Sequence, residues 1–227
     1  MSKSAIDLLS VEVEAGPDSP AVMRRPENYA RSLFHVLSAA TALVLLRVAP
    51  ERKWLVMVSL SLALFAWSLE TLRRVHPPAN AYLMRFFSRI AHAEETHKVN
   101  SSTWYLTALV GLALFAPLRA AELGVVVLGL ADPAAGFIGR RIGRTKIRKN
   151  RSLEGTLGFF AVGMAAAFGL LVVFHALPLP SMLVIAAVAS AAGALVELAT
   201  IRLDDNFTIP VAVAGVVAVF ERLVLAI

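Results

Sequence analysis

The chain has 227 residues, of which 58% are hydrophobic and 17% are charged; its mean hydropathy is +0.70 and its formal net charge is +6. A soluble domain of this size needs far more polar surface, so the composition predicts an all-α, polytopic membrane helix bundle. Cysteine is absent, which excludes disulfides, thiol catalysis and zinc–thiolate sites. Residues 1–28 contain acids and prolines but no continuous apolar core, and we expect a flexible cytosolic tail rather than a cleaved signal peptide.

Apolar segments long enough to cross a bilayer follow this tail, and we interpret residues 29–227 as a single membrane-embedded domain. The segments lie at residues 32–49, 54–69, 103–118, 120–138, 156–177, 181–201 and 208–226. The third segment is short and the fourth follows it closely, so six spans are an alternative to the seven that we predict.

Lysine and arginine are distributed unevenly over the loops of this topology. The amino terminus and the second, fourth and sixth loops share one side of the membrane and carry all but five of the 22 lysines and arginines. The five exceptions are Arg47, Arg52, Lys53, Arg119 and Arg222. Because cytoplasmic loops are rich in these residues, we predict a cytosolic amino terminus and an external carboxyl terminus. The topology accounts for the positive charge, and we expect no nucleic-acid partner.

Residues 79–93, between the second and third segments, carry apolar side chains at helical spacing. The apolar positions are Tyr82, Leu83, Phe86, Phe87 and Ile90. The pattern predicts either a helix in the cytosolic membrane interface or a short helix that packs over the bundle.

Asp132-Pro133, within the fourth segment, is typical of a helix start, with an acidic N-cap and a proline at the first helical position. We therefore predict that this helix breaks near residues 129–132 and restarts with its N–H groups directed at a phosphate. Gly136, Gly139 and Gly143 follow on one helical face, which allows close approach of either a neighbouring helix or a nucleotide.

The loop at residues 140–154 is strongly cationic. Its basic residues are Arg140, Arg141, Arg144, Lys146, Arg148, Lys149 and Arg151. Topology and anionic lipids explain such a loop by themselves, but beside Asp132 and the glycines it also suits nucleotide phosphates. Glu154, two residues after Ser152, is either a first-turn acid favoured by the helix dipole or a ligand of a magnesium ion or an arginine.

Glu197, Asp204, Asp205 and Asn206 place three carboxylates and an amide within ten residues. Carboxylates cost roughly 2.5–3.5 kcal/mol each at the centre of a membrane helix, so they are rarely without a role there. Asx residues can cap a helix, but oxygen donors of this kind also suit Mg²⁺. In the seven-span topology these acids, Asp132 and Glu154 reach the cytosolic side, which predicts a metal–phosphate site at that membrane surface.

These residues resemble the group of CTP-dependent lipid kinases that includes dolichol kinase, phytol kinase and CTP-dependent diacylglycerol kinase. The matching residues are Asp132, Ala135, Gly139, Gly143, Ser152, Glu154, Gly155, Glu197, Asp204, Asp205, Asn206, Ile209 and Pro210. Arg31 and His35 match part of an early Arg-Lys-x-x-His motif. The chain departs from the group's pattern at Ala131, where glycine is usual, and at Ser32 and Arg151, where lysine is usual.

The resemblance implies transfer of the γ-phosphoryl group of CTP to the hydroxyl of a membrane lipid alcohol, which would be a polyprenol such as dolichol, a phytol-like isoprenoid or diacylglycerol. It implies Mg²⁺ at Asp132, Asp204 and Asp205, and catalytic roles for Asp132, Glu197 and Asp204, with Asp132 or Glu197 as the base. The expected nucleotide-binding residues are Gly136, Gly139, Arg140, Gly143, Arg144, Lys146, Arg151, Ser152, Glu154 and Asn206.

Two other functions stay open at this stage. A cytidylyltransferase that forms CDP-lipid shares the membrane, CTP, Mg²⁺ and a similar Asp/Gly/Arg segment, and a small membrane transporter or inactive scaffold could also use buried acids. For the kinase we expect a multi-pass protein of the bacterial cytoplasmic membrane with its site facing the cytosol. The identity of the lipid, the choice of CTP or ATP and the oligomeric state stay open as well.

Overall fold

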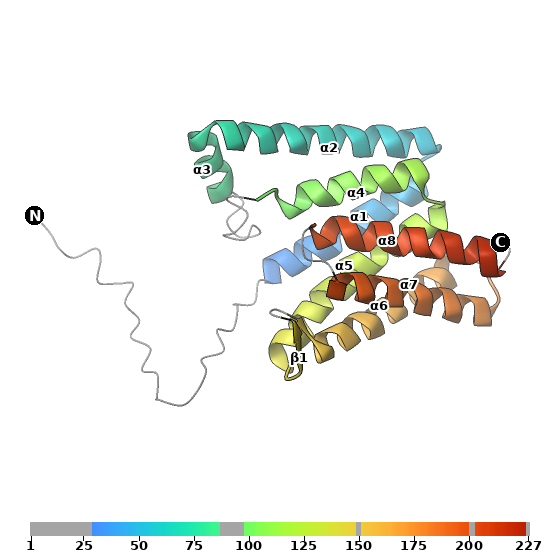
Figure 1. The fold of residues 1–227 in the computed structure, drawn as a ribbon. Helices are drawn as coiled ribbons and strands as arrows, with labels where there is room; N and C mark the ends of the chain where they lie inside the picture. The colour runs from blue at the N-terminus through green and yellow to red at the C-terminus, as the bar shows by residue number, and fades with distance from the viewer. Residues whose placement is uncertain (1–28, 87–97, 149–150, 200–202, 226–227) are drawn as a thin grey trace, which may run out of the picture.

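The computed structural model describes residues 29–86, 98–148, 151–199 and 203–225, and the predicted tail at residues 1–28 lies outside them (Figure 1). The helices are α1 (Tyr29–Val48), α2 (Arg52–Val75), α3 (Pro77–Phe86), α4 (Ser101–Phe115), α5 (Leu118–Arg141), α6 (Leu153–Phe174), α7 (Leu179–Ala199) and α8 (Asp205–Phe220), which continues as a π-helical turn (Glu221–Leu225). The strands are β1 (Lys146–Arg148) and β2 (Arg151–Ser152).

Within the described residues, six helices are long and apolar enough to cross a membrane: α1, α2, α5, α6, α7 and α8. The third predicted segment forms α4, whose 15 residues rise about 22 Å, less than the hydrocarbon core of about 30 Å. The expected polytopic helix bundle is therefore confirmed; six of the described helices reach the length of a membrane span, and the shorter α4 runs beside them from one end of the bundle to the other (Figure 1). Helix α4 packs lengthwise between α2 and α8 (Figure 1).

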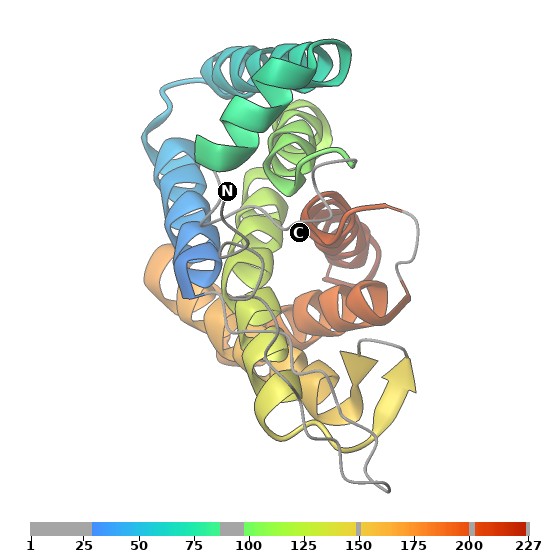
Figure 2. The ribbon, with the colours of Figure 1, turned by 90° about the vertical axis from the view of Figure 1, so that its left-hand side faces the viewer.

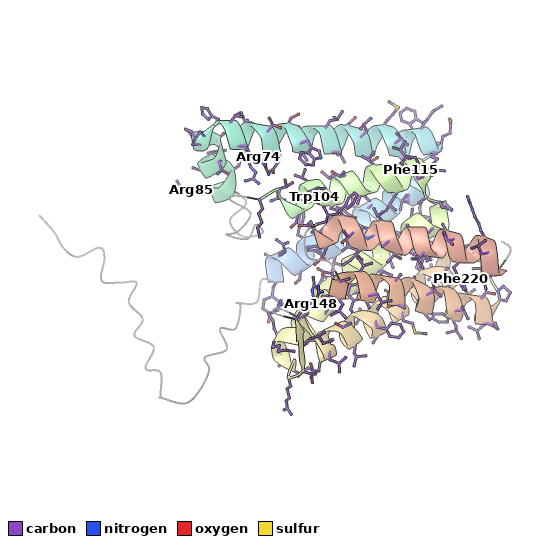
Figure 3. All side chains as sticks on the ribbon, viewed as in Figure 1. Arg74, Arg85, Trp104, Phe115, Arg148 and Phe220 are labelled. Carbon is purple, nitrogen blue, oxygen red and sulfur yellow. The ribbon has the colours of Figure 1, made fainter. Side chains whose placement is uncertain are left out.

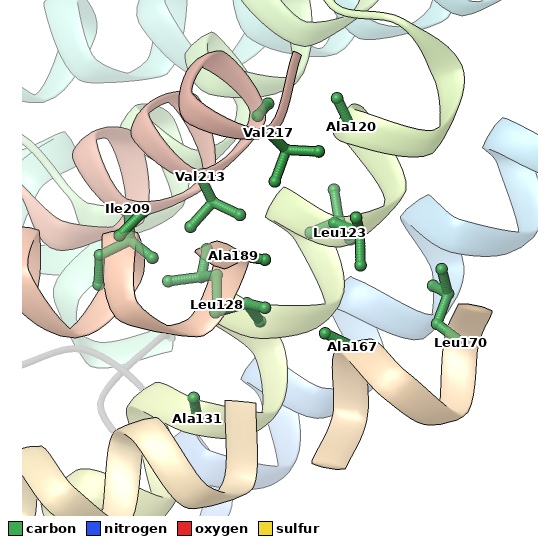
Figure 4. Packing of buried hydrophobic residues seen from close by; sticks show 14 of the residues in the cluster. Ala120, Leu123, Leu128, Ala131, Ala167, Leu170, Ala189, Ile209, Val213 and Val217 are labelled. Atoms are coloured by element: carbon green, nitrogen blue, oxygen red, sulfur yellow. The ribbon is translucent and has the colours of Figure 1, made fainter. Parts of the chain in front are cut away.

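The central helix of the bundle is α5, which packs against α1, α6, α7 and α8. Its buried residues Leu123 and Leu128 meet Val213 and Ile209 of α8 and Ala189 of α7 in the hydrophobic core (Figure 4). Because α5 is covered on several sides, any acid on it that lies toward the bundle interior is held away from lipid.

Helix α5 runs unbroken through Pro133, so the predicted break and restart near residues 129–132 is wrong. Proline removes one backbone hydrogen bond and crowds the residue four positions earlier, here Gly129. Membrane helices tolerate this when neighbouring helices hold them in place. Gly129 packs against Ala39 of α1 so closely that a Cβ atom at this position would overlap the alanine side chain.

The cationic loop forms a short antiparallel hairpin between α5 and α6, in which Lys146 pairs with Ser152 and Arg148 with Arg151. Arg148 Nη1 also donates to the carbonyl of Ala199 at 3.1 Å, which ties the hairpin to the end of α7. These strands were not predicted from the sequence.

The hairpin marks one end of the bundle, which we call the hairpin end. The first turns of α1, α4, α6 and α8 and the last turns of α2, α5 and α7 all lie toward it, and Figure 2 views the bundle from this end (Figures 1 and 2). Arg74, Arg85 and Arg148 lie toward this end, whereas Phe115 and Phe220 lie toward the opposite one (Figure 3). Helix α3, beside the end of α2, covers the first part of the helix predicted at residues 79–93; residues 87–93 lie outside the described residues.

Candidate functional site

Arg151 of the hairpin joins two acids that come from different helices. Its Nη2 atom donates to Asp205 Oδ2 at 2.6 Å, and its Nη1 atom forms an ion pair with Glu197 Oε1. Glu197 lies in the last turn of α7 and is 5% exposed, while Asp205 opens α8. The planar guanidinium group of arginine can contact two carboxylates at once. The ammonium group of a lysine at this position would lack that planar geometry.

Asp204 is the N-cap of α8 and also belongs to a second chain of polar contacts. Its Oδ1 atom accepts hydrogen bonds from the backbone N–H of Asn206 at 3.0 Å and from Asn206 Nδ2 at 2.8 Å. Its Oδ2 atom accepts from Ser101 Oγ at 2.9 Å, and Ser101 Oγ accepts from Arg31 Nη2 at 3.1 Å. The starts of α1, α4 and α8 are thereby connected.

Ser101 is a site residue that was not predicted from the sequence. It directly follows Asn100, whose side chain caps α4 by accepting from the backbone N–H of Ser102 at 2.8 Å. Polar residues at a helix start are ordinarily capping residues, so nothing in the local sequence marked this serine as a partner of Asp204.

Asp132 of α5 is half-buried. It lies within electrostatic range of Arg151 and of the contacts between Arg31, Ser101 and Asp204. The charged residues that act on its carboxylate are Arg151, Arg31, Asp204 and Arg140. Three cations and the acid Asp204 are thus within electrostatic range of a carboxylate that the sequence identified as a candidate site residue, and a second acid joins them. Asp205 also lies within electrostatic range of Asp132 and Asp204. That these three acids bind a metal together stays a prediction.

Gly139 and Gly143 serve the crossing of α5 and α6. A Cβ atom on Gly139 would lie 3.2 Å from Ser152 Oγ, and one on Gly155 would lie 3.3 Å from Gly139 Cα. A Cβ atom on Gly143 would overlap the carbonyl of Gly139 and the side chain of Ser152. Close approach of a neighbouring helix accounts for these two glycines, and their contact with a nucleotide stays a prediction.

Gly136 faces a cation instead, because its added Cβ atom would lie 3.0 Å from Arg140 Nη1. Arg140, Arg144 and Lys146 are exposed around the hairpin and leave their charged groups accessible to an anion. Such an arrangement suits the phosphates of a nucleotide.

Ser152 and Glu154 shape the start of α6. Ser152 is its N-cap, with Oγ accepting from the backbone N–H of Gly155 at 3.2 Å. The Glu154 carboxylate accepts from the backbone N–H of Thr145 at 3.0 and 3.3 Å, which closes the base of the hairpin. This contact favours the first-turn structural role for Glu154, and its role toward magnesium stays a prediction.

The acids fit Mg²⁺ as part of a site shared with a substrate. No group of three or more His, Asp or Glu residues in the described part of the chain is arranged to hold a metal by itself. Mg²⁺ in phosphoryl-transfer sites is commonly held by one or two carboxylates together with phosphates and waters. Glu197 Oε2 is buried and has no hydrogen-bond partner among the described residues, so one carboxylate oxygen is left for a further ligand.

A pocket of about 250 Å³ opens beside the Arg31–Ser101–Asp204 contacts, between α1, α2 and α4. Its polar lining includes Arg31, His35, Ser101 and Asn206 at the hairpin end. Its apolar lining includes Phe34, Phe65, Leu69 and Leu106. This hairpin-end pocket combines a polar end with apolar walls, as binding of an amphipathic molecule requires.

The chain is 29% identical over 158 residues to CTP-dependent diacylglycerol kinase 1 of Eremothecium gossypii, an alignment that covers 61% of this chain and 50% of that protein. It is 26% identical over 166 residues to CTP-dependent diacylglycerol kinase 1 of Saccharomyces cerevisiae, with 63% of this chain and 56% of that protein covered. The chain spans about half the length of these curated relatives. No protein-family model matches the chain, and no solved structure does. The comparisons therefore confirm, as a distant similarity, the resemblance to CTP-dependent lipid kinases that the motifs indicated.

Proposed function

We propose that this protein is a CTP-dependent lipid kinase, which transfers the γ-phosphoryl group of CTP to the hydroxyl of a membrane lipid alcohol. The observation that carries the proposal is the meeting of Asp132, Asp204, Asp205 and Glu197 with Arg151 at the hairpin end, beside a pocket with a polar end. The distant similarity to two proteins named CTP-dependent diacylglycerol kinase 1 supports it.

The donor half of the site is the hairpin and the end of α5. Phosphoryl transfer depends mainly on positioning and on stabilisation of charge around the transferred group. The exposed side chains of Arg140, Arg144 and Lys146, together with Arg151, supply that charge from one loop. Asp132, Asp204 and Asp205 would hold Mg²⁺, which would offset the negative charge of the phosphates.

The acceptor half lies toward the hairpin-end pocket. Asp132 is the better supported base, because it lies in electrostatic range of Arg31, which lines that pocket. It would take the proton of the lipid hydroxyl as the hydroxyl oxygen bonds to the γ-phosphorus and the bond to the CDP leaving group breaks. Asp204 already accepts hydrogen bonds from Ser101 and Asn206, which suits a fixed positioning or metal-binding group.

The test uses purified protein in lipid–detergent micelles with Mg²⁺ and γ-labelled CTP or ATP. Acceptors are polyprenols, phytol, geranylgeraniol, diacylglycerols and phosphatidate, with Asp132→Asn as the inactive control. We expect label from CTP in the lipid phase with one class of alcohol. Release of pyrophosphate with phosphatidate, without lipid label, would instead support the cytidylyltransferase, and neither product would reject both enzymes and favour a transporter or scaffold.

A further inference from the structure

A second pocket, of about 240 Å³, continues the line of the hairpin-end pocket along the same three helices. Ser38 of α1 lines the first pocket and Ala42, one turn further, lines the second. On α4, Leu106 lines the first pocket and Leu109 lines the second. On α2, Phe65 lines the first pocket and Leu62 lines the second. The two pockets therefore lie end to end, and we call them together the lateral groove.

The packing of the surrounding helices leaves this groove beside lipid. Helix α1 packs mainly on α5, and α2 packs mainly on α4 (Figure 2). Residues of α4 line both pockets together with residues of α1 and α2. Apolar lining residues are exposed on both walls, among them Val48 of α1 at 65% and Phe65 of α2 at 63%. In a membrane helix bundle such side chains face hydrocarbon, so the groove is open to the acyl region.

The lining changes from polar to apolar along the groove. The hairpin-end pocket presents Arg31, His35 and Ser101, whereas nearly the whole lining of the second pocket is apolar. The second pocket's hydroxyl side chain, Ser59, donates to the carbonyl of Leu55 in its own helix at 2.7 Å. The groove thus matches a molecule with a small polar head and a hydrocarbon chain.

The position of the groove relative to the acids fixes the direction of such a molecule. Ser101, at its polar end, donates to Asp204. Leu109 and Ala113, which line the second pocket, lie eight and twelve residues further along α4, roughly 12 and 18 Å by helix rise. A chain that begins with its hydroxyl at Ser101 would run toward the bilayer midplane along α4.

We propose that the lateral groove between α1 and α2 binds the hydrocarbon chain of the lipid alcohol and presents its hydroxyl at Arg31, Ser101 and Asp204. This inference rests on the proposed kinase function for the identity of the lipid as a substrate. It adds the route of entry, from the bilayer between α1 and α2, and it makes the second pocket the part of the protein that senses chain length.

The activity test uses a matched pair of substitutions on α2. Leu62 lines the second pocket and Leu60 does not line either pocket, and both are 43% exposed. Leu62→Trp fills the second pocket and is expected to lower kcat/KM for geranylgeraniol and dioleoylglycerol about tenfold, the loss expected when roughly two methylene groups are no longer buried. Geraniol and dioctanoylglycerol, whose chains end earlier, should be affected far less. Leu60→Trp should change neither; equal effects of the two variants would overturn the proposal.

A binding test separates the groove from the kinase function. Geranylgeraniol with a terminal diazirine is irradiated with the full-length protein in micelles, and the labelled peptides are identified by mass spectrometry. We expect label on α1, α2 and α4 around the second pocket, reduced in Leu62→Trp and in the methyl ether of the same probe. Such label without any kinase activity would reject the proposed function and keep the groove. Kinase activity with label elsewhere would overturn the groove and keep the function.

Discussion

Ser101 donates a hydrogen bond of 2.9 Å to Asp204 across 103 positions of sequence. The contact joins the first residue of α4 to the N-cap of α8, and Arg31 of α1 donates to the same serine hydroxyl at 3.1 Å. The Ser101 hydroxyl thus lies between a guanidinium group and a carboxylate. The hydroxyl of an acceptor alcohol needs the same two kinds of group beside it. Ser101 therefore connects the pocket that we assign to the lipid with the acids that we assign to phosphoryl transfer.

Removal of the Ser101 hydroxyl should impair activity more than folding. Ser101→Ala is expected to lower kcat/KM by about ten- to a hundredfold, the usual range for a hydrogen bond to a charged group, with little change in Tm. Ser101→Thr keeps the hydroxyl and should recover most of the activity. Ser68→Ala is the matched control, since that serine bonds only to Leu64 in its own helix among the described contacts. A large fall in Tm for Ser101→Ala would show that the serine is purely structural.

Arg151 should stabilise the fold, because it is the cation paired with the buried carboxylate of Glu197. Arg151→Gln leaves a buried carboxylate without its cation, which costs roughly 3 kcal/mol of unfolding free energy. The double substitution Arg151→Gln with Glu197→Gln removes both charges and should regain much of the loss. Thermal unfolding in detergent measures these differences.

The same pair separates stability from function. Because Glu197 is itself a predicted catalytic residue, the reference is the single variant Glu197→Gln: if Arg151 also binds phosphate, the double variant is less active than Glu197→Gln in the labelled-CTP assay. Equal activity of the double variant and Glu197→Gln would contradict the assignment of Arg151 to the donor half of the site.

The opposite end of the bundle holds a buried ion pair that should matter only for stability. Glu122 of α5 is fully buried; Arg47 of α1 donates to it at 2.7 Å, and His175 Nε2 lies 2.8 Å from its Oε2. Glu122→Gln should lower the unfolding free energy by about 2–4 kcal/mol, because the arginine loses its counter-charge. Activity per folded molecule, measured well below Tm, should match the wild type. A selective loss of activity would mean that this end takes part in the reaction.

Two glycines of α6 should respond oppositely to alanine. At Gly155 the added Cβ atom would lie 3.1 Å from the carbonyl of Ala135 and 3.3 Å from Gly139 Cα, so α5 and α6 must separate, at a cost of about 1–3 kcal/mol. At Gly169 the added atom meets nothing within 4 Å, and alanine should stabilise the helix by about 0.5–1 kcal/mol. Thermal unfolding of the two variants compares them directly, and equal shifts would contradict the close helix crossing.

The orientation in the membrane can be read from cysteine labelling, since the natural chain contains no cysteine. We expect the hairpin end to face the cytosol, because most lysines and arginines lie there. Lys53→Cys, at an exposed position at the start of α2, should react with a membrane-impermeant maleimide added outside whole cells. Lys146→Cys, exposed on the hairpin, should react only after the membrane is opened. The reverse pattern would invert the topology.

The sequence by itself determined the class of the protein and the approximate position of its helices. Apolar composition and segment length are local properties, and they predicted a membrane bundle whose long helices the structure contains. The motif residues carried the resemblance to CTP-dependent lipid kinases, and the comparisons agree with it. Asp204 and Asp205, adjacent in sequence, were also foreseen as part of one acidic group.

Only the tertiary structure decided which partners these residues have. Asp132-Pro133 has the local pattern of a helix start, but packing on α1, α6, α7 and α8 keeps α5 continuous. Ser101 carries no local sign of its contact with Asp204, and Glu122 was not identified although it is fully buried beside Arg47. These contacts join residues 75 or more positions apart. Periodicity and spacing report the preferences of one segment, whereas a hydrogen bond between helices depends on how the whole bundle packs.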